Sequence, residues 1–90
     1  MRAVLDIEEI KQFISSLGAI CGMMHEKKTR MSHEFRELHE VWRDSNYDKF
    51  EKSFSEAVAE IDRFIRYSEM YAEYLQRKAQ AAERYLEGRY

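Results

Sequence analysis

The sequence predicts an all-α protein, an antiparallel two-helix hairpin that dimerises into a four-helix bundle. Apolar residues recur at alternating steps of three and four through both halves of the chain, which places them on one stripe of a helix. The chain has no proline and three glycines, so little interrupts either half. The one clear break is Trp42-Arg43-Asp44-Ser45-Asn46, close to the midpoint.

Ninety residues form a single domain, 1–90, with a first helix over about residues 6–42, a turn over about 43–46 and a second helix over about 47–87. Charged residues at 36% and aromatic residues at 13% indicate a folded helical protein rather than a disordered one. The net charge of −2 does not favour nucleic-acid binding. No apolar run approaches the roughly 18 residues that span a bilayer, so we expect no membrane insertion.

Two features bear on the compartment. The first five residues are too short and mixed for a secretory signal peptide. The single cysteine, Cys21, excludes an internal disulfide and fits a reducing compartment. We therefore expect a cytoplasmic protein, or one that is exported without a cleavable signal peptide.

The first segment begins with a helix-start signal. Asp6 is expected as the N-cap with Glu9 three residues later, and Leu5 and Ile10 stand at the positions of a hydrophobic staple. The apolar stripe that follows, broken only by Lys28, is predicted to face the second helix. Its members are Ile7, Ile10, Ile14, Leu17, Cys21, Met24, Lys28, Met31, Phe35, Leu38 and Trp42.

The first segment is apolar on more than one side near its middle. Phe13 and Ile20 widen the stripe beside Leu17, and Gly18 and Gly22 lie one turn apart. Small residues at this spacing admit the close approach of another backbone. The alternative is that both glycines only weaken the helix, at about 1 kcal/mol each relative to alanine. These five residues are candidates for an interface.

The second segment is predicted to begin at Ser45 as N-cap with Asp48 at the third position, or else at Asp44 or Asn46. Gly88 is the expected helix stop. Two neighbouring stripes make its apolar face wide. The first contains Tyr47, Phe50, Phe54, Ala57, Ile61, Phe64, Ser68, Tyr71, Leu75, Lys78, Ala82 and Tyr85, and the second contains Val58, Ile65, Ala72, Ala79 and Leu86.

The wide apolar faces predict association. Two helices touch along one line, so much of each face would stay in water unless a partner covered it. The simplest closed solution is a two-fold dimer of the chain with itself, and a related helical hairpin satisfies the same requirement. Phe64, Tyr67, Tyr71 and Tyr74 lie along one flank, where they form either a docking surface or a cover for the intramolecular seam or the dimer interface.

No residue pattern predicts chemistry. His25, His33 and His39 lack the glutamate and histidine spacings of helical metal sites. Cys21 stands on the apolar stripe, where cysteine behaves as a small hydrophobe. Acidic neighbours dilute the cluster of Lys27, Lys28 and Arg30, which indicates a solvated face. We expect no catalytic, metal or cofactor-binding residues.

The length, the central tryptophan and the hairpin pattern together resemble the WXG family of small type VII secretion proteins. Trp42 matches the motif tryptophan, Phe50 the aromatic residue of the second helix and Phe54 the apolar position after it, whereas Asp44 replaces the motif glycine. The resemblance implies a dimerising hairpin that works as a secreted effector or adaptor, beside an export ATPase or a larger toxin protein.

The chain departs from the family in its export signal, which is a tyrosine, three residues and then an acid. In the C-terminal part, Tyr67, Tyr71, Tyr74 and Tyr85 are all followed, four residues on, by a residue that is not acidic. The chain also stops at Tyr90, with no tail expected beyond the helix. The alternative function is therefore a structural or adaptor subunit of a larger complex that stays in the cytoplasm.

Overall fold

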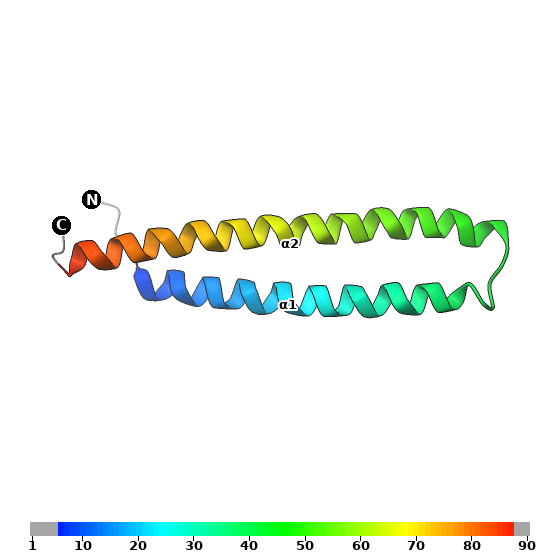
Figure 1. Cartoon of the computed structure of the whole chain (residues 1–90), viewed down its shortest axis with the longest axis horizontal. Coiled ribbons are helices and arrows are strands. Elements are labelled where there is room, and N and C mark those ends of the chain that lie inside the picture. Colours follow the sequence, from blue (N-terminus) through cyan, green and yellow to red (C-terminus); the bar gives the residue numbers. More distant parts are fainter. Residues whose placement is uncertain (1–5, 88–90) are drawn as a thin grey trace.

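The computed structural model describes residues 6–87. These residues form two α-helices, α1 (Ile7–Leu38) and α2 (Ser45–Leu86), and no strand. The helices lie side by side and antiparallel, joined at one end by a short connection that we call the tip (Figure 1). The other end, where α1 begins and α2 finishes, is the open end. The predicted all-helical hairpin is confirmed.

The beginning of α1 follows the sequence signal. Asp6 has an extended backbone, and its side chain accepts a hydrogen bond from the Glu9 amide at 3.1 Å. This bond satisfies one of the free amides of the first turn. Leu5 of the expected staple and Gly88 of the expected stop lie outside the described residues.

The helix boundaries at the tip differ from the predicted ones. α1 finishes at Leu38, and residues 39–42 continue as tight turns in which the Val41 and Trp42 amides both donate to the Leu38 carbonyl. α2 begins at Ser45, and its N-cap is Asp44 rather than Ser45. The reason is that Asp44 is extended, with φ −113° and ψ 179°, and its carboxylate reaches the amides of Asn46 and Tyr47.

The seam of α1 agrees with the predicted stripe throughout its first half. In the second half Phe35 and Trp42 still face inward, but two other members of the stripe do not. The stripe members as far as Met24 and Lys28 lie at least partly buried against α2. Beyond Lys28, Ser32 takes the inner position, whereas Met31 and Leu38 are 41% and 42% exposed. The predicted inward placement of Met31 and Leu38 is therefore wrong.

The seam of α2 is also rotated from the predicted one. Every seventh residue from Tyr47 to Ala82 faces inward as expected, but the second inner row is the neighbouring stripe of Val58, Ile65, Ala72 and Ala79. The predicted seam members that lie exposed instead are Phe50, Ala57, Phe64, Tyr71, Lys78 and Tyr85. The small Ala72 and Ala79 leave room for the branched and longer side chains of α1, which the bulkier Phe64 and Tyr71 would not. Leu86 is exposed because α2 extends past the start of α1 (Figure 1).

The spacing of apolar residues across the tip favours a hairpin over one long helix. The inner residues Phe35 and Trp42 are seven positions apart in the sequence, as are Tyr47 and Phe54. Trp42 and Tyr47, however, are only five positions apart. At 100° per residue, an uninterrupted helix would place the two stripes roughly 140° apart. A turn brings both stripes back to a common seam.

Candidate interaction surfaces

The tip is held by a cluster of aromatic rings that connects α1 to the first turns of α2. Phe35 of α1 stacks on Tyr47 of α2, with ring centroids 4.9 Å apart and planes 6° apart, and its centroid lies 4.6 Å from that of Phe54. His39 covers the outer face of Tyr47 at 4.5 Å. Phe35 and Tyr47 are both buried, so this cluster forms the core of the seam at the tip.

Tyr47 is anchored by its hydroxyl as well as by its ring. The hydroxyl donates to the backbone carbonyl of Phe35 at 3.3 Å, so a buried polar group has a partner. Burial raises the pKa of the Tyr47 phenol above its ordinary value, and the carboxylates of Glu51 and Asp48 raise it further. The phenol therefore stays neutral and remains a donor at physiological pH. This role was not recognised from the sequence, where Tyr47 is one apolar stripe member among many.

Asp44 joins the turn, the second helix and the tryptophan. Its Oδ1 accepts from the indole Nε1 of Trp42 at 2.9 Å, from the Asn46 amide at 2.9 Å and from the Tyr47 amide at 3.2 Å. A glycine at this position would have no side chain to make these bonds. The residue that departs from the WXG pattern is thus the residue that holds the turn.

Trp42 lies in the tip of the hairpin and is half-buried. Its ring meets Tyr47 edge-on at 5.4 Å and lies 6.1 Å from Phe50. The indole N–H already donates a hydrogen bond to Asp44, so a partner that bound Trp42 would contact mainly its ring.

One side of the hairpin carries most of the predicted interface residues, and we call it the aromatic side. It is defined by Phe13 and Ile20 of α1 and by Phe64, Tyr67, Tyr71 and Tyr74 of α2, all of them exposed. In an antiparallel pair, residues at these heptad positions of the two helices flank the same edge of the seam. The ring centroids of Tyr71 and Tyr74 are 6.2 Å apart, and the Lys78 ammonium lies over the Tyr74 ring, 5.9 Å from its centroid. These side chains are therefore exposed in the single hairpin, and their role as a docking surface or as a cover stays a prediction.

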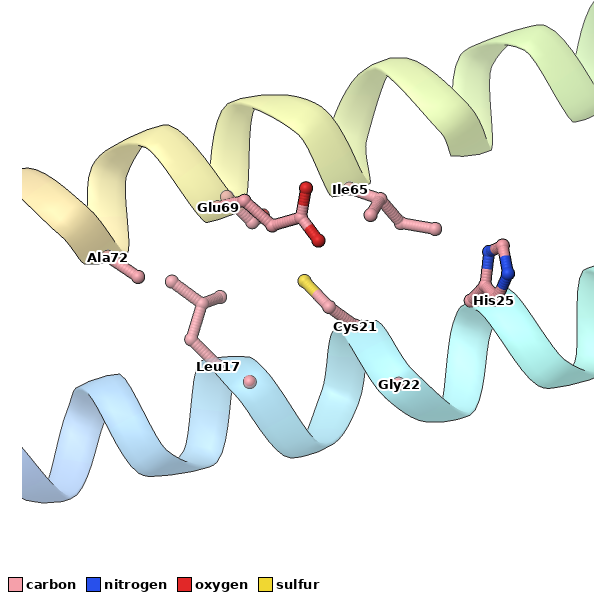
Figure 2. A pocket seen from close by; sticks show the side chains of 9 residues that line it. Leu17, Cys21, Gly22, His25, Ile65, Glu69 and Ala72 are labelled. Carbon is pink, nitrogen blue, oxygen red and sulfur yellow. The ribbon is translucent and has the colours of Figure 1, made fainter.

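The remaining interface candidates lie at the opposite edge of the seam, which we call the glycine side. Leu17, Gly18 and Gly22 line a groove there, together with Ile65, Ser68 and Ala72 of α2 (Figure 2). No heavy atom lies within 4 Å of the position that a Cβ would take at either glycine. The close backbone approach considered from the sequence is therefore not made inside the chain.

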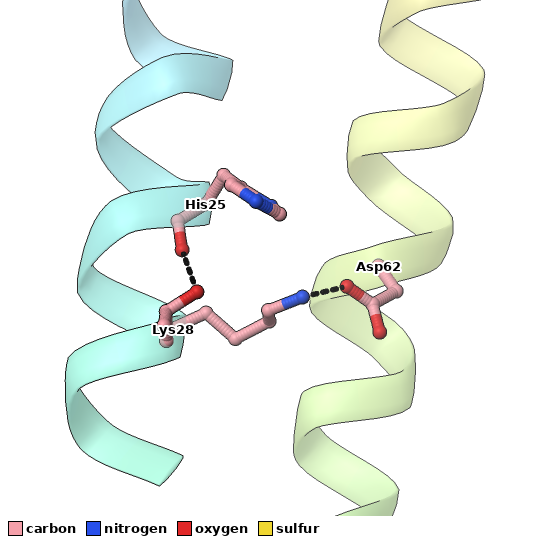
Figure 3. Close-up of polar contacts among 4 residues, drawn as sticks. His25, Lys28 and Asp62 are labelled. Atoms are coloured by element: carbon pink, nitrogen blue, oxygen red, sulfur yellow. Dashed lines mark hydrogen bonds and ion pairs between the residues drawn. The ribbon is translucent and has the colours of Figure 1, made fainter. Parts of the chain in front are cut away.

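An ion pair crosses the seam near its middle. Lys28 reaches from α1 to Asp62 of α2, with Nζ and Oδ1 2.6 Å apart (Figure 3). The Lys28 side chain is only 16% exposed, whereas that of Asp62 is 43% exposed. The hydrogen bond from Lys28 holds the pKa of Asp62 below its ordinary value, against the opposing effect of burial. Lys28, the one charged residue in the predicted apolar stripe of α1, thus pairs with Asp62. The sequence did not predict this partner.

The described residues contain neither a cluster of metal-binding side chains nor a helix that could span a membrane. No group of three or more histidine, cysteine, aspartate or glutamate side chains in residues 6–87 is placed to hold a metal ion. His33 lies 3.7 Å from Glu37, one turn along an exposed face. Within the same range, neither helix contains an apolar stretch long enough to cross a membrane.

We expect Asp44→Ala to lower the free energy of unfolding by about 1–2 kcal/mol, because it removes the cap of α2 and the acceptor for the indole. Asp44→Asn keeps a carbonyl oxygen at the same place, so it should lower the free energy of unfolding by only a few tenths of that amount. Denaturant unfolding followed by the fluorescence of the single tryptophan measures both. Equal stability of the Ala variant and the wild type would show that the tip packing alone holds the turn.

We expect the stabilisation contributed by Asp62 to depend on pH. Its pKa is lower in the folded chain than in the unfolded chain, so the contribution is complete above about pH 5 and is lost as the pH falls through the folded pKa, below about 4. The difference in unfolding free energy between wild type and Asp62→Asn should therefore shrink between pH 7 and pH 2. Glu69→Gln, which removes no ion pair, is the control. A constant difference across that range would contradict the ion pair.

Comparison with known proteins assigns the chain to no family. No protein-family model, curated protein or solved structure matches it. The WXG resemblance therefore remains a matter of Trp42, Phe50, Phe54 and the hairpin itself. Any function must be argued from the surfaces described above.

Proposed function

We propose that the protein is a non-enzymatic protein–protein interaction module, whose first partner is a second copy of itself or a related hairpin. The observation that carries the proposal is the exposed aromatic side. Large apolar side chains in that number, next to one another on one edge of the seam, mark an interface in a water-soluble fold. Tyrosine suits such a surface because it offers apolar area with a polar tip.

The exposed area supports the same proposal. A compact monomer of 10.9 kDa exposes about 5,600 Å², whereas this chain exposes 7523 Å². The excess is about 1,900 Å², which lies within the roughly 1,000–2,500 Å² that each partner buries in an obligate dimer. A second hairpin packed on the aromatic side would remove an area of this size from water and produce a four-helix bundle.

The small buried interior of the single hairpin also supports association. Among the described residues only Cys21, Phe35, Tyr47, Ser68 and Ala79 are buried, so one seam buries little apolar surface. Chains of this length that have no disulfide or metal commonly gain their remaining stability by association. Dimerisation thus serves the stability of the fold as well as its function.

A more specific role follows from the WXG resemblance, and we propose it on that ground. The protein would act as a secreted effector or adaptor of a type VII-like system, with Trp42 at the tip available to an export ATPase or to a larger toxin protein. The half-buried Trp42 ring at the tip of the hairpin supports this role. The bond from the indole N–H to Asp44 favours the alternative, a cytoplasmic adaptor subunit in which Trp42 is structural.

We expect the wild-type protein to sediment as a dimer at micromolar concentration, and Phe64→Glu or Tyr71→Glu to weaken the dimer at least about 30-fold, the effect of losing a central contact. Neither side chain is buried in the hairpin, so the helical circular dichroism should be kept. Ala59→Glu, on the exposed outer face of α2, is the matched control and should remain a dimer. A wild-type monomer at tens of micromolar would contradict the proposal.

Export is tested separately with Trp42→Phe, which keeps most of the packing and removes the indole N–H. In a host with a type VII system, we expect the tagged wild-type protein in the medium and the folded, dimeric variant to be retained. If folded Trp42→Ala were exported as well as the wild type, Trp42 would have no recognition role. If the wild type itself stayed inside the cell, the adaptor alternative would be favoured.

A further inference from the structure

The glycine side of the hairpin contains a partly enclosed groove of about 350 Å³ between α1 and α2. Its walls are mainly apolar, formed by Leu17 and Cys21 of α1 and by Ile65 and Ala72 of α2 (Figure 2). The volume is large enough for about two side chains of leucine or lysine size, and small for a drug-sized ligand. Because the groove and the aromatic side flank opposite edges of the seam, a second copy on the aromatic side would leave the groove open.

Gly18 and Gly22 line the part of the groove that belongs to α1, and the space beside each of them is open. A side chain at either position would meet no heavy atom within 4 Å. A glycine in the interior of a helix costs about 1 kcal/mol relative to alanine, and here no contact within the described chain makes use of the space. The space is therefore available to a group from outside, and two small residues one turn apart let a helix approach closely.

Glu69 adds a negative charge to this apolar groove. Figure 2 shows its carboxylate between the helices, above Cys21. Its neighbours on α2 have partners, since Glu60 pairs with Arg63, Asp62 with Lys28 and Glu73 with Arg77. No ion pair or side-chain hydrogen bond within residues 6–87 involves the Glu69 carboxylate, and His25 of α1 is the other titratable side chain that lines the groove. A group that fits this groove has an apolar body and a positive charge.

We propose that the groove binds an amphipathic α-helix of another protein, with an apolar side chain placed over Gly18 and Gly22 and a lysine or arginine ending at Glu69. Lysine and arginine suit the site because their aliphatic stems pack on apolar walls while the cation reaches the carboxylate. An apolar helix face in a groove between two helices is an established mode of peptide recognition. The inference rests on the proposed function as an interaction module, and it adds a second, different partner on the other side.

The probe for this site is a synthetic 20-residue helical peptide that carries leucine and lysine one turn apart along one face, with alanine and glutamine elsewhere. Its matched control replaces each lysine by glutamate. Binding to the full chain is measured by calorimetry, and its location by amide shifts in nitrogen-15 NMR spectra. We expect the lysine peptide to shift Gly18 and Gly22, and to bind at least about tenfold more tightly than the glutamate peptide.

Two variants test the groove against non-specific adhesion. Gly22→Leu fills the groove with a residue that favours a helix, so the variant should melt at a higher temperature, keep its dimer mass and lose at least about tenfold in affinity for the lysine peptide. Glu69→Lys should reverse the preference and bind the glutamate peptide more tightly. Tyr71→Glu should leave peptide binding unchanged.

The inference is overturned if the lysine peptide fails to bind at about 1 mM, or if Gly22→Leu and Glu69→Lys bind both peptides as the wild type does. Shifts confined to Tyr67, Tyr71 and Tyr74 would equally overturn it, since they place the peptide on the aromatic side. Failure of the dimer is a separate result: a monomeric wild type that still binds the lysine peptide in the groove loses the proposed self-association and keeps this site.

Discussion

Two helices can bury side chains only along the line where they touch, and this constraint decides most of what the hairpin is. Each helix of the pair has an inner row, two flanks and an outer face, and the single seam covers only the inner row. The burial of Cys21, Ser68 and Ala79 with so few other residues is the direct result. Other apolar residues of the seam are only partly buried, and those on the flanks, such as Phe13 and Tyr71, are exposed.

Within that constraint the two ends of the hairpin are built differently. At the tip, Phe35, Tyr47 and Phe54 fill the seam with rings, and Asp44 holds the turn through three hydrogen bonds to one oxygen. Toward the open end the seam contains Cys21, Ser68, Ala72 and Ala79, which pack closely but fill little volume. The small side chains leave room for the groove beside Gly18 and Gly22.

The two flanks consequently offer different chemistry to partners. The aromatic side is broad and dominated by tyrosine and phenylalanine, which suits a symmetric contact with a second hairpin. The glycine side is narrow, partly enclosed and bordered by the Glu69 carboxylate, and it also contains the ion pairs Lys28–Asp62 and Lys11–Glu83. Under the proposed function, the two unlike sides would let the chain bind a copy of itself and a different partner at the same time, as an adaptor does.

The sequence alone determined the class of fold, the position of the turn and the N-cap at Asp6, because these depend on local spacing and on side chains that bond to their own backbone. It left the cap of α2 open among Asp44, Ser45 and Asn46, since all three residue types can accept from free amides. The structure shows that Asp44 is the cap, because its backbone is extended and its carboxylate accepts from the amides of Asn46 and Tyr47 as well as from the indole of Trp42. It also decided the rotation of α2, which moved Phe64 and Tyr71 out of the predicted seam and Val58 and Ala79 into it. Apolar spacing shows that a wide face exists, but the part of that face that turns inward depends on which side chains fit against the opposite helix, and that is a property of the pair.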